Sequence, residues 1–120
     1  MVVFLGEGHS GGALAFANAN VVMMLDDSLF NVASPEAVAA ILHGQQSVSE
    51  AIDLLPMTAS ELQQRGLVDD VIDHRQATLV DMLCQRIQDT VTELQKQSAI
   101  DLIAQREAKF KDFMDWWPQG

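Results

Sequence analysis

The chain has 120 residues, of which 48% are apolar, and this suffices for about one domain with a hydrophobic core. Its net charge of −10 argues against nucleic acid or an anionic membrane surface as a partner, because both bind through a basic face. All seven Lys and Arg residues lie at or after Arg65, whereas residues 1–64 carry seven carboxylates. We therefore do not expect the first half to hold a ligand through several phosphates.

The chain is predicted to begin with a strand, a glycine turn, a helix and a second strand. Residues 2–5 are β-branched, aromatic and aliphatic, which is typical of a short buried strand. Ser10 is a candidate N-cap for a helix through residues 11–19. Residues 21–25 form the second apolar run, and two aspartates end it.

Helix signals dominate the middle of the chain. Each predicted helix begins at a Ser or Thr whose side chain can cap it, and two of them carry a glutamate three residues later. Residues 67–72 then predict one more short strand. The predicted helices are residues 33–44, with Ser34 as N-cap and Pro35 at the first position, residues 47–55, with Ser47 and Glu50, and residues 58–66, with Thr58 and Glu61.

From about Arg75 the apolar residues recur with a helical period, and the pattern restarts at Ser98. We expect a helical hairpin, or one long helix broken near Ser98, whose apolar stripe is core or a subunit contact. The single cysteine, Cys84, falls within this pattern and is expected to be a buried small hydrophobe rather than a nucleophile. The stripe comprises Leu79, Leu83, Ile87, Val91 and Leu94, then Ile103, Phe110, Met114 and Trp117.

These elements predict one α/β unit, residues 1–74, followed by a helical extension, residues 75–120. A parallel sheet of about three strands that starts at residue 2 would lack flanking strands, so we expect a portion of a larger protein or half of an assembly. The chain has no signal peptide and no run of 18 apolar residues, which makes a soluble cytoplasmic protein the default expectation.

The glycines after the first strand allow two interpretations. Gly6, Gly8 and Gly11 match the GxGxxG pattern, and Asp26 follows at the spacing of a dinucleotide-binding fingerprint. However, the sequence lacks the further strands and helices that complete a dinucleotide-binding domain. The nucleotide-binding module is therefore the less favoured alternative.

The second interpretation is an oxyanion site. Backbone N–H groups of Ser10, Gly11 and Gly12 at a helix N-terminus can meet a carbonyl oxygen closely, because no bulky side chain intervenes. Such a site stabilises an enolate or a ureido oxyanion without Lys or Arg. This interpretation agrees with the absence of both residue types from residues 1–64.

Three motifs in order carry a family resemblance. The segments GEGHSGGALA, LDDSLFNVASPEAVAAIL and MTASELQQRGLVDDVI, within about residues 2–73, resemble the carboxyltransferase alpha subunit of bacterial acetyl-CoA carboxylase. That family belongs to the crotonase superfamily, and the tail LIAQREAKFKDF is similar to its final helix. The resemblance implies an α/β fold, namely the C-terminal part of a crotonase-like (ClpP/crotonase) fold.

The resemblance also implies a reaction. In this family the carboxyl group passes from carboxybiotin, borne by a biotin carboxyl carrier protein, to acetyl-CoA, and malonyl-CoA for fatty acid biosynthesis results. The active site lies between an alpha and a beta subunit of an oligomer. As less than half of an alpha subunit, this chain is expected to have little or no activity alone, and a non-catalytic interaction fragment is the main alternative.

Carried over residue by residue, the resemblance assigns the oxyanion N–H groups to Gly11 and Gly12. Crotonase hydratases place a glutamate just after their glycine run, where this chain has Leu14, so no general base is expected there. Carboxyl transfer does not need one, because the ureido anion of biotin can itself take the proton. The implied substrate-binding residues are Gly8, Ser10, which caps the turn, and Phe30, Ser34, Pro35 and Glu36, which shape the neighbouring wall.

Two substitutions depart from the family pattern. His9 stands where glycine is usual, and is interpreted as a tolerated surface residue or, less readily, as a proton-transfer group. Asn20 replaces an aspartate, with an effect expected only on local turn hydrogen bonds.

Two other groups of residues invite a functional interpretation. The acidic group Asp69, Asp70, Asp73 and His74 fits no zinc pattern and is expected to be solvated, so no metal is predicted. Trp116 and Trp117 are interpreted as an interface anchor or as cover for the last helix.

Overall fold

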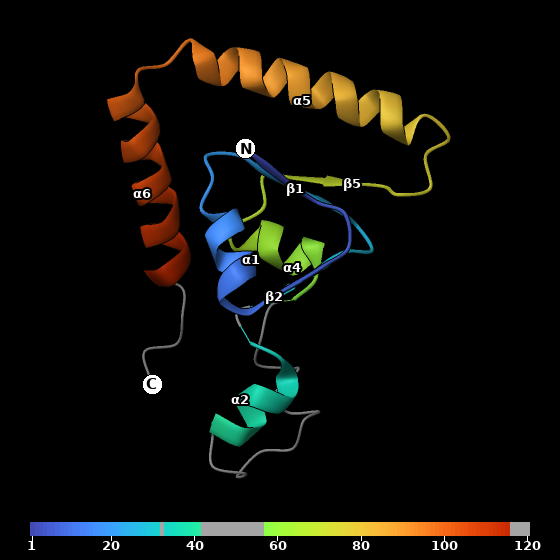
Figure 1. Cartoon of the computed structure of the whole chain (residues 1–120), viewed down its shortest axis with the longest axis vertical. Coiled ribbons are helices and arrows are strands. Elements are labelled where there is room, and N and C mark those ends of the chain that lie inside the picture. The colour runs from blue at the N-terminus through green and yellow to red at the C-terminus, as the bar shows by residue number, and fades with distance from the viewer. Residues whose placement is uncertain (32, 42–56, 116–120) are drawn as a thin grey trace.

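The computed structural model describes residues 1–31, 33–41 and 57–115, and these form a mixed α/β structure (Figure 1). Five short strands lie at its centre, with helices around them. The strands are β1 (Val2–Phe4), β2 (Glu7–His9), β3 (Val22–Leu25), β4 (Leu29–Asn31) and β5 (Asp70–Ile72), and the helices are α1 (Ser10–Ala17), α2 (Pro35–Ile41), α4 (Ala59–Gln64), α5 (Leu79–Gln95) and α6 (Ala99–Asp115).

The strands form two small parallel sheets. The first has the order β1-β3-β5, and the second pairs β2 with β4. Three strands were predicted from the sequence, and all three are confirmed as members of the first sheet. The predicted glycine turn over residues 6–9 is wrong in part, because residues 7–9 are strand β2, which the pairing with β4 holds extended.

Strand β3 is apolar throughout because both faces of the first sheet are covered. Val22 and Met24 point into the main core, while Met23 and Leu25 belong to a second cluster on the other face. All four side chains are buried. The main core also contains buried residues of α1, β4, α4 and α6, including Ala13, Ala17, Phe30, Ala59, Leu62 and Phe113.

Local capping chemistry explains where several helices begin. The hydroxyl of Thr58 accepts a hydrogen bond from the Glu61 N–H, and the Glu61 carboxylate accepts one from the Thr58 N–H, which confirms this predicted capping box. The restart at Ser98 is also confirmed, since its Oγ accepts from the Asp101 N–H. The predicted helix over residues 47–55 lies outside the described residues.

Helix α6 packs against the core and is held there by polar contacts as well. Its Phe113 is buried in the main cluster. The Asn20 side-chain amide donates to the Leu102 carbonyl at 2.6 Å, and Lys109 pairs with Asp69, which also accepts from the Val22 N–H. The expectation that Asn20 affects only a local turn is therefore wrong, and so is the expectation that Asp69 is merely solvated.

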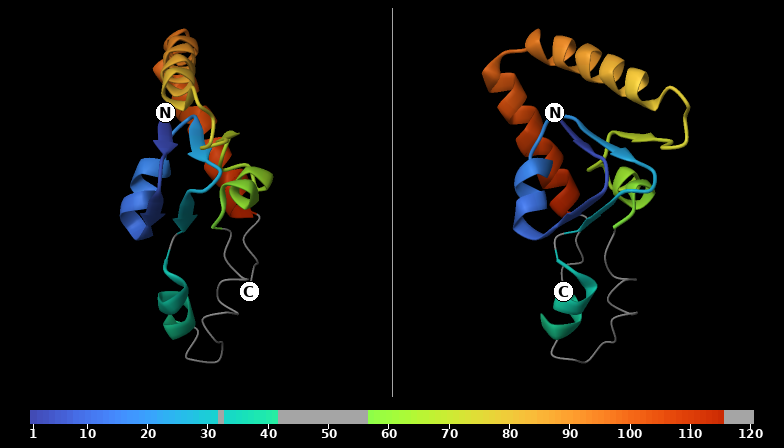
Figure 2. Two further views of the ribbon diagram at one scale, coloured as in Figure 1. Left: turned by 90° about the vertical axis from the view of Figure 1, so that its right-hand side faces the viewer. Right: turned by 45° about the vertical axis from the view of Figure 1, so that its right-hand side comes forward.

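Helix α5 lies beside the first sheet (Figures 1 and 2), and most of the α5 residues are exposed to solvent. Its N-terminal residues Leu79, Met82 and Leu83 pack against the second cluster, but none of its residues is buried. For α5 the prediction of a core stripe is therefore wrong at Ile87 and Val91, which are exposed, whereas Phe110 of the α6 part packs against the main core as predicted. Cys84 is exposed, not buried as expected, because it lies outside this packed segment.

The rest of the acidic group near β5 also makes specific contacts. Asp70 pairs with Arg86, and Asp73 accepts a hydrogen bond from the Arg75 N–H. His74 lies between the two aspartates that follow β3, with Nδ1 2.6 Å from an Asp26 oxygen and Nε2 3.7 Å from an Asp27 oxygen. Asp70 thus pairs with a basic side chain and Asp73 with a backbone N–H, so neither is an isolated carboxylate.

The contact between Asp26 and His74 makes the stability of the fold depend on pH. The Asp26 hydrogen bond raises the pKa of His74 above 6.5, and the N–H and ring of His74 lower the pKa of Asp26 below 3.8. The histidine contribution is complete below pH 6.5 and is lost as pH rises through the raised pKa, while the aspartate contribution is lost as pH falls below 3.8. We expect His74→Gln to lower the melting temperature most between these limits and to leave it unchanged at about pH 9.

Thermal unfolding at both pH values checks this expectation. A destabilisation by His74→Gln that is as large at the alkaline pH as in the acidic window would assign the role of His74 to packing rather than to charge.

Within the described residues, no helix is both long and apolar enough to cross a membrane.

Candidate functional site

The parallel pairing of β2 and β4 brings several predicted site residues to one end of the second sheet. His9 ends β2 and is aligned with Asn31, which ends β4. Helix α1 begins directly after His9, and α2 begins at Pro35, four positions after Asn31. Because the carboxyl ends of parallel strands share one edge, the starts of both helices follow this edge (Figure 1).

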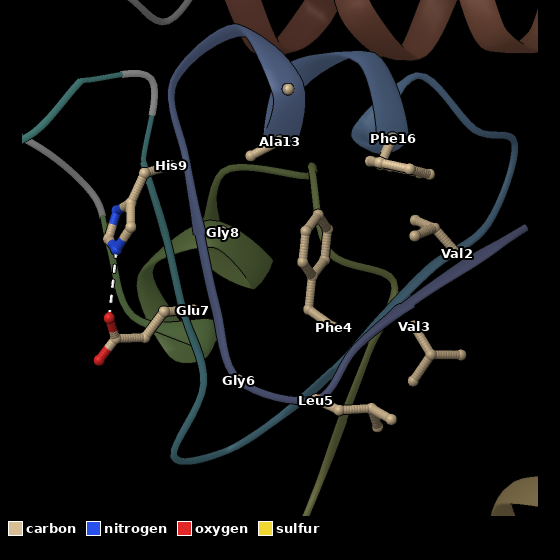
Figure 3. Close-up of a pocket in the computed structure, with 11 residues that line it drawn as sticks. Val2, Val3, Phe4, Leu5, Gly6, Glu7, Gly8, His9, Ala13 and Phe16 are labelled. Carbon is tan, nitrogen blue, oxygen red and sulfur yellow. Dashed lines mark hydrogen bonds and ion pairs between the residues drawn. The ribbon is translucent and has the colours of Figure 1, made fainter.

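Gly8 is required for packing. Successive residues of β2 alternate between its faces, so Gly8 points away from Glu7 and His9. A Cβ atom at Gly8 would lie 3.0 Å from the Phe4 ring and 3.2 Å from the Ala13 Cβ, so a larger residue would require Phe4 or α1 to shift by a few tenths of an ångström (Figure 3). The absence of a side chain therefore lets α1 and the Phe4 ring close over β2.

Gly11 and Gly12 stand in the opposite situation. Both are exposed, and a Cβ atom on either would meet nothing within 4 Å. As residues of the first turn of α1, they have N–H groups without an acceptor inside the helix, and no side chain caps this end. Space and free donors at the positive end of the helix dipole are the two requirements for receiving a ligand oxygen.

The structure corrects the predicted role of Ser10. The N-cap of α1 is His9, in extended conformation, and the Ser10 side chain does not cap the helix. Instead Ser10 has a φ of 65°, the one positive φ at a non-glycine residue within the described residues. This left-handed geometry turns the chain from β2 into α1, which begins at Ser10.

Left-handed backbone costs an ordinary residue about 1–2 kcal/mol, whereas glycine adopts it freely. We expect Ser10→Gly to raise the free energy of unfolding by roughly 1 kcal/mol, less the added chain entropy of glycine. Urea unfolding followed by circular dichroism measures this difference. A loss of stability would mean that the serine hydroxyl contributes more to the turn than the strain removes.

Phe30 is a core residue, which corrects its predicted place in the substrate wall. It is 2% exposed and packs on Phe4 with ring centroids 5.2 Å apart, so its side chain has no surface to offer a ligand. As a buried residue of β4, it anchors that strand in the main core. Among the other predicted wall residues, Ser34 accepts a hydrogen bond from the Ala37 N–H, which confirms its capping role, and Glu36 is exposed in the first turn of α2.

His9 takes part in a hydrogen-bonded network that the sequence did not reveal. Its Nδ1 lies 2.8 Å from the Asn31 Oδ1, and its Nε2 lies 3.3 Å from a Glu7 carboxylate oxygen. Asn31 is 3% exposed, and its amide nitrogen faces the Met57 sulfur at 3.2 Å. The hydrogen bond to Asn31, and then the one to Glu7, raise the pKa of His9 above 6.5.

Beside this network an open groove of about 430 Å³ runs between β1, β2 and α1. It is lined mainly by apolar side chains together with His9 and Gly12 (Figure 3). Phe16, at 73% exposure, forms one of its walls. Leu14, two residues after Gly12, is 37% exposed and offers no proton-transfer group.

Sequence reasoning missed the partners of His9. The spacing of Glu7 and His9, two residues apart in a strand, was the available signal for their contact. No sequence signal pointed to Asn31, because it lies 22 residues away and its position depends on the parallel register of β2 and β4.

Comparison with known proteins agrees with the motifs. Residues 1–114 match the family described as acetyl co-enzyme A carboxylase carboxyltransferase-like. The acetyl-coenzyme A carboxylase carboxyl transferase subunit alpha of Streptococcus equi subsp. zooepidemicus strain MGCS10565 is 38% identical over 117 residues, which cover 94% of this chain and 46% of that protein. Proteins of the same name from Streptococcus thermophilus and Streptococcus pyogenes serotype M5 are 37% and 36% identical, with the same coverage.

The chain thus spans less than half the length of these curated relatives. Because the family match nevertheless includes all described strands and helices up to residue 114, the chain belongs to the acetyl co-enzyme A carboxylase carboxyltransferase-like family.

Proposed function

We propose that this chain provides the oxyanion-binding part of a biotin-dependent carboxyltransferase. The reaction would move the carboxyl group of carboxybiotin to acetyl-CoA and yield malonyl-CoA, the first committed building block of fatty acid biosynthesis. The observation that carries this proposal is the pair of free N–H groups at Gly11 and Gly12, with open space in front of both glycines. Membership of the family supplies the chemistry to which these donors fit.

In the proposed site, backbone N–H groups rather than side chains bind the reacting oxygen. The N–H groups of Gly11 and Gly12 would bind the oxygen on which negative charge develops, and the α1 dipole would add to their effect. Gly8 and Ser10 would place these donors by shaping the turn from β2 into α1. Biotin supplies the ureido nitrogen that carries the carboxyl group, and this uncharged ring suits a surface without Lys or Arg.

The rest of the proposal follows the family. We infer a crotonase-like core over residues 1–74 with a helical extension over residues 75–120, and Ser34, Pro35 and Glu36 as the neighbouring wall at the start of α2. A beta subunit and a biotin carboxyl carrier protein are the proposed partners in an oligomer. Because the chain spans 46% of its relatives, we expect it to need complementing polypeptides for turnover.

Complementation tests the proposal. The purified chain is mixed with a bacterial beta subunit, with or without an upstream alpha fragment, and transfer of the carboxyl group from malonyl-CoA to free biotin is measured. Turnover that requires this chain is the expected result. A folded chain that binds the beta subunit but supports no turnover in any mixture would contradict the catalytic role.

That outcome would favour the second candidate, a non-catalytic interaction fragment. The exposed apolar side chains Val80, Ile87 and Val91 of α5 are the observation on its side, because such a helix face is typical of protein contacts. The dinucleotide alternative gains nothing from the geometry, since strand β2 occupies the positions where that fingerprint needs a tight turn.

A further inference from the structure

The contacts of His9 favour its protonated form. The Asn31 side chain directs its nitrogen to Met57 and therefore presents its oxygen to the imidazole. A carboxylate of Glu7 faces the other ring nitrogen. Both partners accept hydrogen bonds and cannot donate them, so only an imidazole with a proton on each nitrogen satisfies both contacts.

The two contacts differ in strength and permanence. Asn31 is buried and its oxygen is 2.8 Å from Nδ1, so this contact sets the plane of the ring. The Glu7 side chain is 70% exposed and its oxygen is 3.3 Å from Nε2, so little holds it there. Another carboxylate can replace Glu7 at Nε2 without any change in the position of the ring.

We propose that His9 is a carboxylate-binding residue at the edge of the candidate site, positioned by Asn31 and paired with Glu7 only until a substrate carboxylate takes its place. The inference rests on the proposed function and names the substrate feature recognised, which is the carboxylate of the carboxylated donor or product. Acetyl-CoA and biotin lack this group at the reacting end. His9 therefore distinguishes carboxylated from uncarboxylated ligands.

The surroundings of His9 support this role. Residues 1–64 contain no Lys or Arg, so a protonated His9 supplies positive charge where the sequence otherwise provides little. Glu7 of β2 is the charged group that faces it, while β4 contributes the uncharged Asn31. His9 also occupies the N-cap position of α1, next to the free N–H groups, although its side chain does not cap the helix.

The test uses malonate as the probe on the full chain, at constant ionic strength, with the imidazole signals followed by NMR. We expect saturable shifts of the His9 signals at about pH 6, and binding weaker by about two- to fivefold at an alkaline pH above the raised pKa of His9, where the ring loses its charge. Malonamide, which has the same shape without charge, is expected to cause no shift. Equal shifts with malonamide, or no loss at the alkaline pH, would overturn the proposal.

Three variants sharpen the result. Glu7→Gln is expected to tighten malonate binding at about pH 5.5, well below the ordinary pKa of histidine, because the imidazole stays protonated there and the competing carboxylate is removed. His9→Gln is expected to abolish the effect of malonate on the neighbouring amide signals. His74→Gln is the matched control, because it removes a histidine that pairs with Asp26 elsewhere in the fold, and it is expected to leave the effect unchanged. Weaker binding by Glu7→Gln, or the same loss with His74→Gln, would contradict the assignment to His9.

The position of Asn31 behind His9 is tested separately. Asn31→Asp replaces the amide by a carboxylate and is expected to raise the pKa of His9 further, which moves the pH limit of malonate binding upward. A change in stability alone, without this move of the pH limit, would make Asn31 purely structural. These measurements do not depend on turnover, so a chain that complements the beta subunit but ignores malonate would refute this inference and leave the proposed function intact.

Discussion

Gly12→Val is expected to reduce complemented carboxyltransfer by roughly a hundredfold or more, the usual effect of losing one oxyanion donor. The valine side chain fits the fold, because a Cβ at Gly12 meets nothing within 4 Å. It would occupy the space through which the substrate oxygen must approach the N–H group. Steady-state transfer of the carboxyl group from malonyl-CoA to biotin measures the effect.

The stability of the same variant separates function from folding. Because Val and Gly differ little in helix propensity, we expect the free energy of unfolding to change by less than about 0.5 kcal/mol. Ala15→Val is the matched control, since Ala15 is exposed on α1 but lies beyond its first turn. Full activity of Gly12→Val, or an equal loss with Ala15→Val, would contradict an oxyanion role for this helix end.

Phe30→Ala is expected to cost about 3–5 kcal/mol in the free energy of unfolding. Phe30 is 2% exposed and in ring contact with Phe4, so truncation leaves a cavity in the main core and removes an aromatic pair. A loss of this size is a large fraction of the stability of a typical domain. Urea unfolding monitored by circular dichroism gives both the free energy of unfolding and its dependence on urea concentration.

Phe16→Ala provides the control for this prediction. The same change is made in the same part of the chain, but Phe16 is 73% exposed, and we expect a change within about 0.5 kcal/mol. A large loss at Phe16 would show that a partner surface or a second copy covers the groove in solution. A small loss at Phe30 would contradict its place in the core.

Sequence reasoning succeeded where the signal was local or strongly apolar. Strand β3 was predictable because an uninterrupted apolar run of strand length indicates burial on both faces. The starts at Thr58 and Ser98 were predictable because a capping side chain and its N–H partner lie three residues apart. The family was recognisable because its motifs occur in order along one continuous stretch, and the family match confirms it.

The candidate site was predictable only in part. The glycine run indicated exposed N–H groups at a helix start, and Gly11 and Gly12 do stand there. Local pattern could not show that Gly8 is needed for packing rather than for a ligand, because the atoms that its Cβ would meet belong to other elements. The apolar stripe of α5 misled for the opposite reason, since periodicity shows which side chains share a face but not whether anything covers it.

The sequence by itself determined the family, the three strands of the first sheet, and the helix starts at Ser34, Thr58 and Ser98, because each depends on residues close together in the chain. Only the tertiary structure decided that residues 7–9 are a strand, that Ser10 adopts a left-handed turn, that Asn31 holds His9, and that Asn20 anchors α6. The two side-chain contacts join residues 22 and 82 positions apart. Their partners are chosen by strand register and helix packing, which no short stretch of sequence contains.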